Sequence, residues 1–291
     1  MSERGPGHPR TRFKVRHGAA THPGLVRGHN EDSLLASRNT YLVADGLGGH
    51  AKGEVASQAV VAAFRAESQA DWLTPEGLHR ALEQASRVIV QASGGVGRAP
   101  GSTVVGVGLA AQSGLPYWMI FNVGDSRAYM LRSGKLQQIS VDHSRVQAVA
   151  DAGGQANPAA RNVITRAIGA GLPSPVLADQ WLMPAAVGDR VMLCSDGLST
   201  EVSDQLIAAT LLAFCEPQEA ADELVRAALN AGGRDNVTVV VVDAIEVTGA
   251  VDTLGVDEDT LGGPPIGIED QATLPGDEAL WTSDGEGVRH A

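Results

Sequence analysis

Apolar runs alternate with polar turns along most of the chain and predict strands. The runs are rich in valine and are bounded by glycine, aspartate or serine. The candidate strands are TYLVA ending at Ala44, STVVGVGLA from Ser102, YWMIFNV ending at Val123, RAYML from Arg127, DRVMLCS ending at Ser195 and VTVVVVD from Val237. Because GDS and RSGK are turn-length connections, the runs that they join are expected to form an antiparallel meander.

A spacing of three or four residues between apolar positions predicts helices in other segments. Thr74 and Pro75 suit the N-cap and first turn of one helix, and Gly232 with Gly233 would end another. The expected helices cover residues 54–68, 75–91, 203–213 and 218–230. Helix pairs combined with antiparallel strands favour a layered sandwich of the α+β class.

Charge divides the chain of 291 residues into parts of different character. The formal charge is −12, but residues 246–291 hold 11 Asp/Glu and one Arg, so almost all of the acidity belongs to that tail. We therefore expect a flexible arm at 1–12, one domain at 13–245 and a disordered acidic tail at 246–291. The tail contains DTLG twice and ATLPG once. These segments are either low-complexity drift or phosphothreonine motifs that recruit a phosphothreonine-reading domain.

The composition excludes several classes of function. The chain lacks the basic face of a nucleic-acid-binding protein, and no run approaches the length of a membrane span. Its two cysteines, Cys194 and Cys215, lie in apolar surroundings, which favours a reducing compartment over a disulfide framework. The sequence thus predicts a cytoplasmic protein with no membrane segment, and we expect a monomer.

Acidic residues recur where predicted strands meet turns. The motifs are NED at 30–32, ADG at 44–46, GDS at 124–126, SDG at 195–197 and RDN at 234–236. Carboxylates held by strand ends can converge on one point only if a cation offsets their repulsion. Oxygen donors without Cys or His favour Mg²⁺ or Mn²⁺ over zinc. Any single motif of this kind could also be ordinary turn chemistry, since Asp before Gly is common in turns.

The ordered motifs of the chain resemble a known family. GLVRGHNEDS, VADGLGGHAKGEVAS, GSTVV, NVGDSRAYMLRSGKL, DHSRVQAVADAG, RNVITRAIG, LCSDGL and GGRDNVTVVVV occur between about residues 20 and 243. In this order they resemble the metal-dependent PPM family of serine/threonine protein phosphatases, also called protein phosphatase 2C, in its bacterial form. The resemblance implies a four-layer α-β-β-α sandwich with two antiparallel sheets between helix pairs.

The resemblance also implies a site with two Mn²⁺ or Mg²⁺ ions and assigns its ligands. Asp45 would bridge both ions, and the Gly46 carbonyl would bind one of them. Asp196 and Asp235 would bind the other. Glu31 and Asp32 would act largely through water, and Asp125 would join Asp196 in holding a third, weaker ion.

Two further side chains are expected to act on the phosphate ester. Arg27 can grip phosphate oxygens bidentately, although an ion pair with Glu31 four residues on is an alternative. His50 is the candidate proton donor to the leaving alkoxide, or else a spectator at a helix start. His29 and His143 are expected to be structural or solvent-facing.

Two places in the motif pattern leave questions open. His22 stands where the family usually has an aspartate, which is expected to affect metal affinity or the ordering of Arg27. Residues 144–165 match the variable flap beside the active site, where Arg145 and Arg161 either meet a phosphopeptide or face solvent.

The leading hypothesis is a phosphatase that acts on phosphoserine and phosphothreonine proteins and opposes a bacterial Ser/Thr kinase. The alternative is a weakly active phosphatase-fold protein that binds phosphoproteins or acts as an adaptor through its tail. Retention of Asp45, Asp196 and Asp235 favours the enzyme.

Overall fold

The computed structural model of the protein describes residues 11–48, 51–93, 99–154, 163–172 and 176–249. All of the described residues belong to the first of the two units into which the chain divides, residues 1–252. His50, Arg161 and the threonine motifs of the tail therefore lie outside the described residues.

Two five-stranded antiparallel sheets form the centre of the first unit. The first sheet has the order β1-β13-β12-β8-β9, and its strands are β1 (Arg12–His22), β13 (Val237–Thr248), β12 (Arg190–Cys194), β8 (Arg127–Arg132) and β9 (Lys135–Gln138). The second has the order β11-β7-β6-β3-β2, with β11 (Asp179–Pro184), β7 (Leu115–Val123), β6 (Val104–Gln112), β3 (Thr40–Ala44) and β2 (Ser33–Ala36). A small third sheet is made of β10 (Ile168–Gly169), β5 (Gly101–Ser102) and β4 (Gly46–Leu47).

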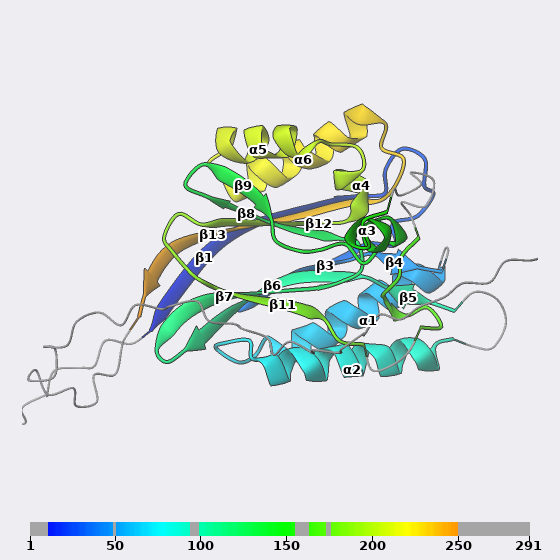
Figure 1. Ribbon diagram of the computed structural model, residues 1–291, viewed down its shortest axis with the longest axis horizontal. Coiled ribbons are helices and arrows are strands. Elements are labelled where there is room, and N and C mark those ends of the chain that lie inside the picture. Colours follow the sequence, from blue (N-terminus) through cyan, green and yellow to red (C-terminus); the bar gives the residue numbers. More distant parts are fainter. Residues whose placement is uncertain (1–10, 49–50, 94–98, 155–162, 173–175, 250–291) are drawn as a thin grey trace, which may run out of the picture. The chain divides into compact units, whose positions relative to one another are not determined.

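Helices cover the outer faces of both large sheets (Figure 1). The two covering pairs are α1 (Ala51–Glu67) with α2 (Pro75–Gln91) and α5 (Asp204–Ala213) with α6 (Pro217–Ala231), whereas the short helices α3 (Arg145–Asp151) and α4 (Asp196–Ser199) lie at one end of the sandwich. The pair α1 and α2 packs on the second sheet, where Val60 and Leu82 share a core with Phe121. The pair α5 and α6 packs on the first. The expected four-layer sandwich is confirmed.

A third core fills the space between the two sheets. Val43 and Trp118 from the second sheet pack here with Val240 from the first. Because β13 lies between this core and the helix layer, its residues Val237–Ala244 are all buried. Burial on both faces explains why VTVVVVD is a continuous apolar run instead of an alternating one.

The expected meander is only half correct. Strands β8 and β9 pair through the RSGK turn, where Ser133 and Gly134 have φ of 51° and 76°. Strands β7 and β8, in contrast, belong to different sheets, so the GDS turn crosses between the layers. From sequence alone, a short polar turn that joins two strands of one sheet looks the same as a turn that crosses from one sheet to the other. The crossing brings Asp125 to the end of the sandwich.

Strand β1 begins at Arg12, the last residue of the expected flexible arm at 1–12. Its charged residues face carboxylates: Lys14 pairs with Glu246, and Arg16 with Asp243 at 3.1 Å. These pairs accompany the antiparallel register of β1 with β13, which continues to Thr248, three residues past the expected domain boundary. Strands β2, β4, β10 and β11 and helices α3 and α4 were likewise not predicted. No helix among the described residues is long and apolar enough to cross a bilayer.

Candidate active site

The acidic positions singled out in the sequence lie at strand ends on one side of the sandwich. Asp45 directly follows β3, and Asp196 opens α4, separated from β12 only by Ser195. Asp125 lies between β7 and β8, Asp235 precedes β13, and the pair Glu31–Asp32 precedes β2. In Figure 1 this is the end where α3, α4, β4 and β5 gather. Both large sheets therefore contribute carboxylates to the same region.

The carboxyl groups are close enough to change one another's acidity. Burial, followed by the charges of Asp32, Asp196, Asp125 and Asp235, raises the pKa of Asp45 well above its usual range. Burial and the charge of Asp235 raise the pKa of Asp196 to about 6. Burial is also the main cause that raises the pKa of Asp32 to about 7 and that of Asp125 to about 7. The structure thus brings Asp45, Asp196 and Asp235 together, with Asp32 and Asp125 beside them.

These shifts predict that the metal-free protein loses stability as the pH rises. A carboxyl whose pKa is raised by folding binds its proton more tightly in the folded state than in the unfolded state. Its contribution to the free energy of unfolding is therefore complete at a pH below the pKa of the unfolded state, and it is lost as the pH rises through the pKa of the folded state. We expect chelator-treated protein to lose a few kcal/mol of unfolding free energy between about pH 5 and about pH 8, measured by urea denaturation. Asp32→Asn should flatten this dependence. A stability that rises with pH over that range would contradict the expectation.

Hydroxyl side chains hold the strand ends that carry the acids. Thr103 takes both main-chain groups of Asp45: its Oγ1 accepts from the Asp45 N–H at 3.1 Å, and its N–H donates to the Asp45 carbonyl at 2.9 Å. Its Oγ1 also lies 2.8 Å from Ser126 Oγ in the GDS turn. Ser195 Oγ donates to Asp32 Oδ2 at 2.8 Å. Sequence reasoning missed these residues, although for Ser126 and Ser195 a hydroxyl residue within an acidic motif was the available signal.

Glycines allow backbone segments to meet beneath Asp45. A Cβ on Gly46 would overlap the carbonyl oxygen of Gly53 in α1 and would lie 2.6 Å from that of Glu31. A Cβ on Gly53 would in turn overlap the carboxylate of Glu31. The absence of side chains here lets the NED loop, β4 and α1 approach at backbone distance.

Asn236, the last residue of RDN, anchors the loop that carries Arg27 and Glu31. Its Nδ2 donates to the carbonyls of Pro23 at 2.9 Å and His29 at 2.8 Å, and its Oδ1 accepts from the Glu31 N–H at 2.8 Å. Its side chain is buried. An amide can do all this because it both donates and accepts. The sequence had indicated a role for Asp235 of this motif but none for Asn236.

Arg27 extends from this loop to the acidic cluster. Its Nη2 donates to Asp235 Oδ2 at 2.7 Å, while the Arg27 side chain remains 57% exposed. The hydrogen bond with Asp235, with smaller contributions from Glu31 and Asp45, raises the pKa of the guanidinium. The ion pair that forms is with Asp235, in place of the alternative pair with Glu31. An exposed guanidinium held at the rim of the cluster can reach an incoming oxyanion.

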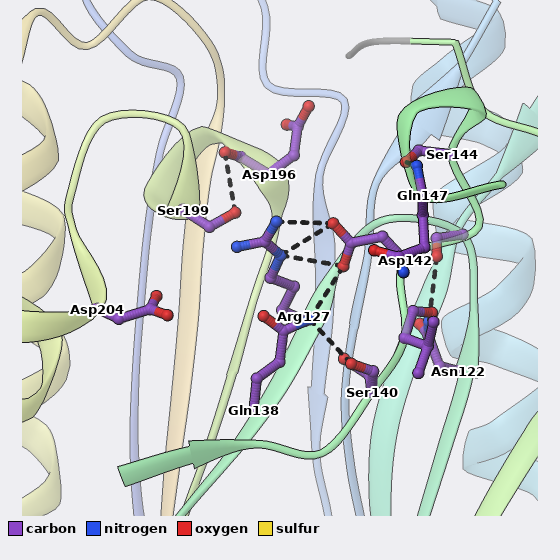
Figure 2. Close-up of polar contacts among 12 residues, drawn as sticks. Asn122, Arg127, Gln138, Ser140, Asp142, Ser144, Gln147, Asp196, Ser199 and Asp204 are labelled. Atoms are coloured by element: carbon purple, nitrogen blue, oxygen red, sulfur yellow. Dashed lines mark hydrogen bonds and ion pairs between the residues drawn. The ribbon is translucent and has the colours of Figure 1, made fainter. Parts of the chain in front are cut away.

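A pocket of about 220 Å³ opens beside Asp125 and Asp196. Figure 2 shows Arg127 in this pocket, with its guanidinium turned toward Asp142. Arg127 donates to both carboxylate oxygens of Asp142 at 2.7 to 3.1 Å. The pocket is completed by Ser144, Val146 and Gln147 at α3 and by Ser199 and Thr200 at α4. The end of the site therefore includes a neutralised guanidinium that sequence reasoning did not single out.

The histidines take different parts. His22 Nδ1 accepts from the Gly24 N–H at 3.0 Å, so this residue shapes the start of the Arg27 loop. His143 is buried and hydrogen-bonded on both ring nitrogens, which agrees with the expected structural role. His29 is exposed, and its carbonyl is held by Asn236. Arg145, at the start of α3, is exposed.

The chemistry of the donors fits hard divalent cations. The site offers carboxylate and backbone oxygens, and the Oδ1 atoms of Asp32 and Asp125 are buried without a hydrogen-bond partner among the described residues. Such orphaned acceptors are costly unless a cation or solvent completes them. Over the part of the chain that the structure describes, no three His, Cys, Asp or Glu side chains already have the arrangement of a closed metal site. The fit of the site to divalent cations therefore rests on three observations: the donors are oxygens, the carboxylates repel one another, and two buried carboxylate oxygens lack hydrogen-bond partners among the described residues.

Comparison with known proteins decides the family. A family model described as protein phosphatase 2C matches residues 28–231. The chain belongs to the protein phosphatase 2C family. This match spans the segment from the NED motif to α6, and it confirms the membership that the ordered motifs predicted.

Two protein phosphatase 2C relatives illustrate the similarity. The serine/threonine protein phosphatase PstP of Mycobacterium tuberculosis is 38% identical over 276 residues, which cover 91% of this chain and 51% of that protein. The serine/threonine phosphatase stp of Listeria welshimeri is 31% identical over 244 residues, which cover 77% of this chain and 93% of that protein. The chain thus spans about half the length of PstP.

A solved structure of the same family supports the fold. The catalytic domain of PstP, crystallised in complex with two manganese ions, superposes with a TM-score of 0.72 at 37% identity. The superposition covers 81% of this chain and 100% of that one.

Proposed function

We propose that this chain is a metal-dependent protein phosphatase that hydrolyses phosphoserine and phosphothreonine in proteins. The convergence of Asp45, Asp196 and Asp235 from separate strand ends, with Arg27 beside them, carries this proposal. Membership of the protein phosphatase 2C family and the two manganese ions in the PstP structure support it.

The proposed ligands follow from the donor set. Asp45 would contact both of two Mn²⁺ or Mg²⁺ ions, the Gly46 carbonyl one of them, and Asp196 with Asp235 the other. Glu31 and Asp32 would act through water. Asp125 and Asp196 would hold a third ion. When bound, a pair of such ions supplies a hydroxide nucleophile at neutral pH and neutralises charge on the phosphate.

The residues of the chain orient the ester around those ions. Thr103 holds the main chain of Asp45 and pairs with the Ser126 hydroxyl, and Ser195 holds one oxygen of Asp32, so these positions are set before substrate arrives, which lowers the cost of reorganisation. Asn236 fixes the loop from which Arg27 reaches the phosphate oxygens. His50 remains the proposed proton donor to the leaving serine or threonine oxygen.

Metal-dependent hydrolysis of a phosphothreonine peptide tests the proposal. Turnover should require Mn²⁺ or Mg²⁺, disappear with a chelator and return when excess Mn²⁺ is added. The adaptor alternative predicts the opposite: phosphopeptide binding, measured by fluorescence anisotropy, without turnover at any concentration of metal. Partners beyond phosphoproteins, namely an opposing Ser/Thr kinase and a phosphothreonine-reading domain on the tail, belong to this proposal as well.

Arg27→Lys is expected to lower kcat/KM on phosphopeptides by about 10- to 100-fold. An ammonium keeps the charge but loses the planar pair of donors, and a hydrogen bond to a charged group contributes about 1.5 to 3 kcal/mol. Arg38→Lys is the matched control, because Arg38 is also exposed and paired with one aspartate, Asp71, at 2.6 Å. Arg38 comes after the last residue of β2, whereas Glu31 and Asp32 of the acidic cluster come before its first residue. Arg38 therefore lies at the opposite end of this strand. Equal effects in the two variants would reject a role of Arg27 in phosphate binding.

A further inference from the structure

His143 holds the residue that precedes Asp125 by both of its main-chain groups. The His143 N–H donates to the Gly124 carbonyl at 2.9 Å, and the Gly124 N–H donates to His143 Nδ1 at 3.0 Å. Gly124 has a φ of 117°, and a Cβ there would lie 2.6 Å from the Cβ and Cγ2 of Thr103. The GDS turn is therefore clamped between Thr103 on one side and His143 on the other.

The far side of the imidazole is fixed as well. Because Nδ1 accepts a hydrogen bond, the proton of the neutral ring lies on Nε2, which faces Asp179 Oδ2 at 3.0 Å. The other oxygen of Asp179 accepts from Arg166 Nη1. Asp179 opens β11, an edge strand of the second sheet. The ring thus links the GDS turn to the sheet edge through one defined tautomer.

The same residue receives the returning end of the flap. The Thr165 N–H donates to the His143 carbonyl at 2.8 Å, and the Arg145 N–H donates to the Val163 carbonyl at 2.8 Å. The segments that enter and leave the flap therefore meet at His143. We call these segments, His143–Arg145 and Val163–Thr165, the flap stem. Because His143 belongs to the stem and is hydrogen-bonded to Gly124, a displacement of the stem would also displace Gly124.

Asp125 is sensitive to such a displacement because its carboxylate is hydrogen-bonded by its own backbone. Its Oδ1 is buried and has no hydrogen-bond partner among the described residues. Its direction therefore depends on the main chain of the GDS turn, which His143 and the Thr103–Ser126 hydroxyl pair hold.

We propose that His143 is a positioning residue that sets the direction of the Asp125 carboxylate and couples it to the flap stem. This inference rests on the proposed function, since it concerns a cation held by Asp125. The essential atom is Nδ1, the acceptor for the Gly124 amide. Asn can place its Oδ1 at that position, whereas Ala provides no acceptor there.

Three variants and one control test the proposal. Asp125→Asn identifies the class of bound Mn²⁺ that depends on this carboxylate, measured by electron paramagnetic resonance of free Mn²⁺. His143→Ala should weaken the same class by about 10-fold or more, as expected for loss of a partner that orients a ligand, and should leave the other classes unchanged. His143→Asn should restore most of that affinity. Hydrogen exchange at the Gly124 amide should be fast in the Ala variant and slow in the Asn variant.

Asp189→Asn separates positioning from stability. Asp189 is buried, like His143, and accepts from Trp118 Nε1 at 2.9 Å and from Arg132, and neither of these hydrogen bonds within the described residues involves the GDS turn. It should lower thermal stability without changing any class of Mn²⁺. The inference is overturned if His143→Ala behaves like this control, if His143→Asn binds Mn²⁺ as poorly as His143→Ala, or if Asp125→Asn affects no class. Wild-type protein that lacks metal-dependent hydrolysis would overturn the proposed function itself.

Discussion

Asp45→Asn is expected to lower kcat on phosphopeptides by about 10³-fold or more while raising the thermal midpoint of the metal-free protein by a few degrees. The two effects have one cause. Asp45 lies among four other carboxylates that raise its pKa, so its charge is unfavourable until cations arrive. Asn keeps the shape and removes the repulsion, and it also removes the ligand proposed to contact both ions.

Calorimetry with chelator and a steady-state assay with Mn²⁺ together check this expectation. Asp243→Asn is the matched control, because Asp243 is also buried but is paired with Arg190 at 2.6 Å and Arg16 at 3.1 Å. Removing its charge leaves the buried guanidinium of Arg190 uncompensated and should destabilise the protein by about 3 kcal/mol. Full turnover by Asp45→Asn, or a lower thermal midpoint with chelator, would contradict the assignment of Asp45.

Gly46→Ala is expected to lower the free energy of unfolding by about 3 kcal/mol, because the added methyl group meets backbone atoms that no rotamer change can move. The obstacles are the carbonyl oxygens of Gly53 and Glu31, which belong to separate segments. Even where the chain folds, the strand end that carries Asp45 must shift, and a displacement of about 1 Å in a catalytic group costs about 10²-fold in rate.

Urea denaturation and phosphopeptide turnover of the Gly46 variant provide the measurement. Gly28→Ala is the control, because a Cβ at Gly28 would meet no atom within 4 Å. This change should alter stability by less than about 0.5 kcal/mol. A Gly46→Ala protein with wild-type stability and turnover would show that the close approach of β4, α1 and the NED loop is unnecessary.

The sequence predicted the elements whose signals are local. Helix α2 begins and ends where Thr74, Pro75 and the apolar spacing indicated, because capping and amphipathicity are encoded within a few residues. Strands β3, β7 and β12 likewise coincide with continuous apolar runs, which arise from burial on both faces.

The elements that were missed depend on distant partners. Strand β1 begins at Arg12, the last residue of the expected flexible arm, and its charged residues find their partners Glu246 and Asp243 only when β13 lies opposite. Strand β11 is half-exposed along its whole length and owes its pairing to β7. Neither partner is visible in the local pattern.

The candidate site shows the same division. Carboxylates at strand ends were visible in the sequence because an apolar run stops at each of them, yet their convergence depends on which strands are neighbours. The suggested pair of Arg27 with Glu31 assumed a helical spacing, but this segment contains no helix, so Arg27 reaches Asp235. The clamps formed by Asn236 and His143 join main-chain groups far apart in sequence, which no spacing rule reveals.

The bonds that Asn236 makes to Pro23 and His29 join the first and last strands of the domain across more than 200 sequence positions. During synthesis the loop with Arg27 leaves the ribosome early and has no anchor until β13 follows. A nascent chain that stops short of Asn236 therefore lacks the hydrogen bonds that hold the Pro23 and His29 carbonyls. Contacts of such long range favour slow folding.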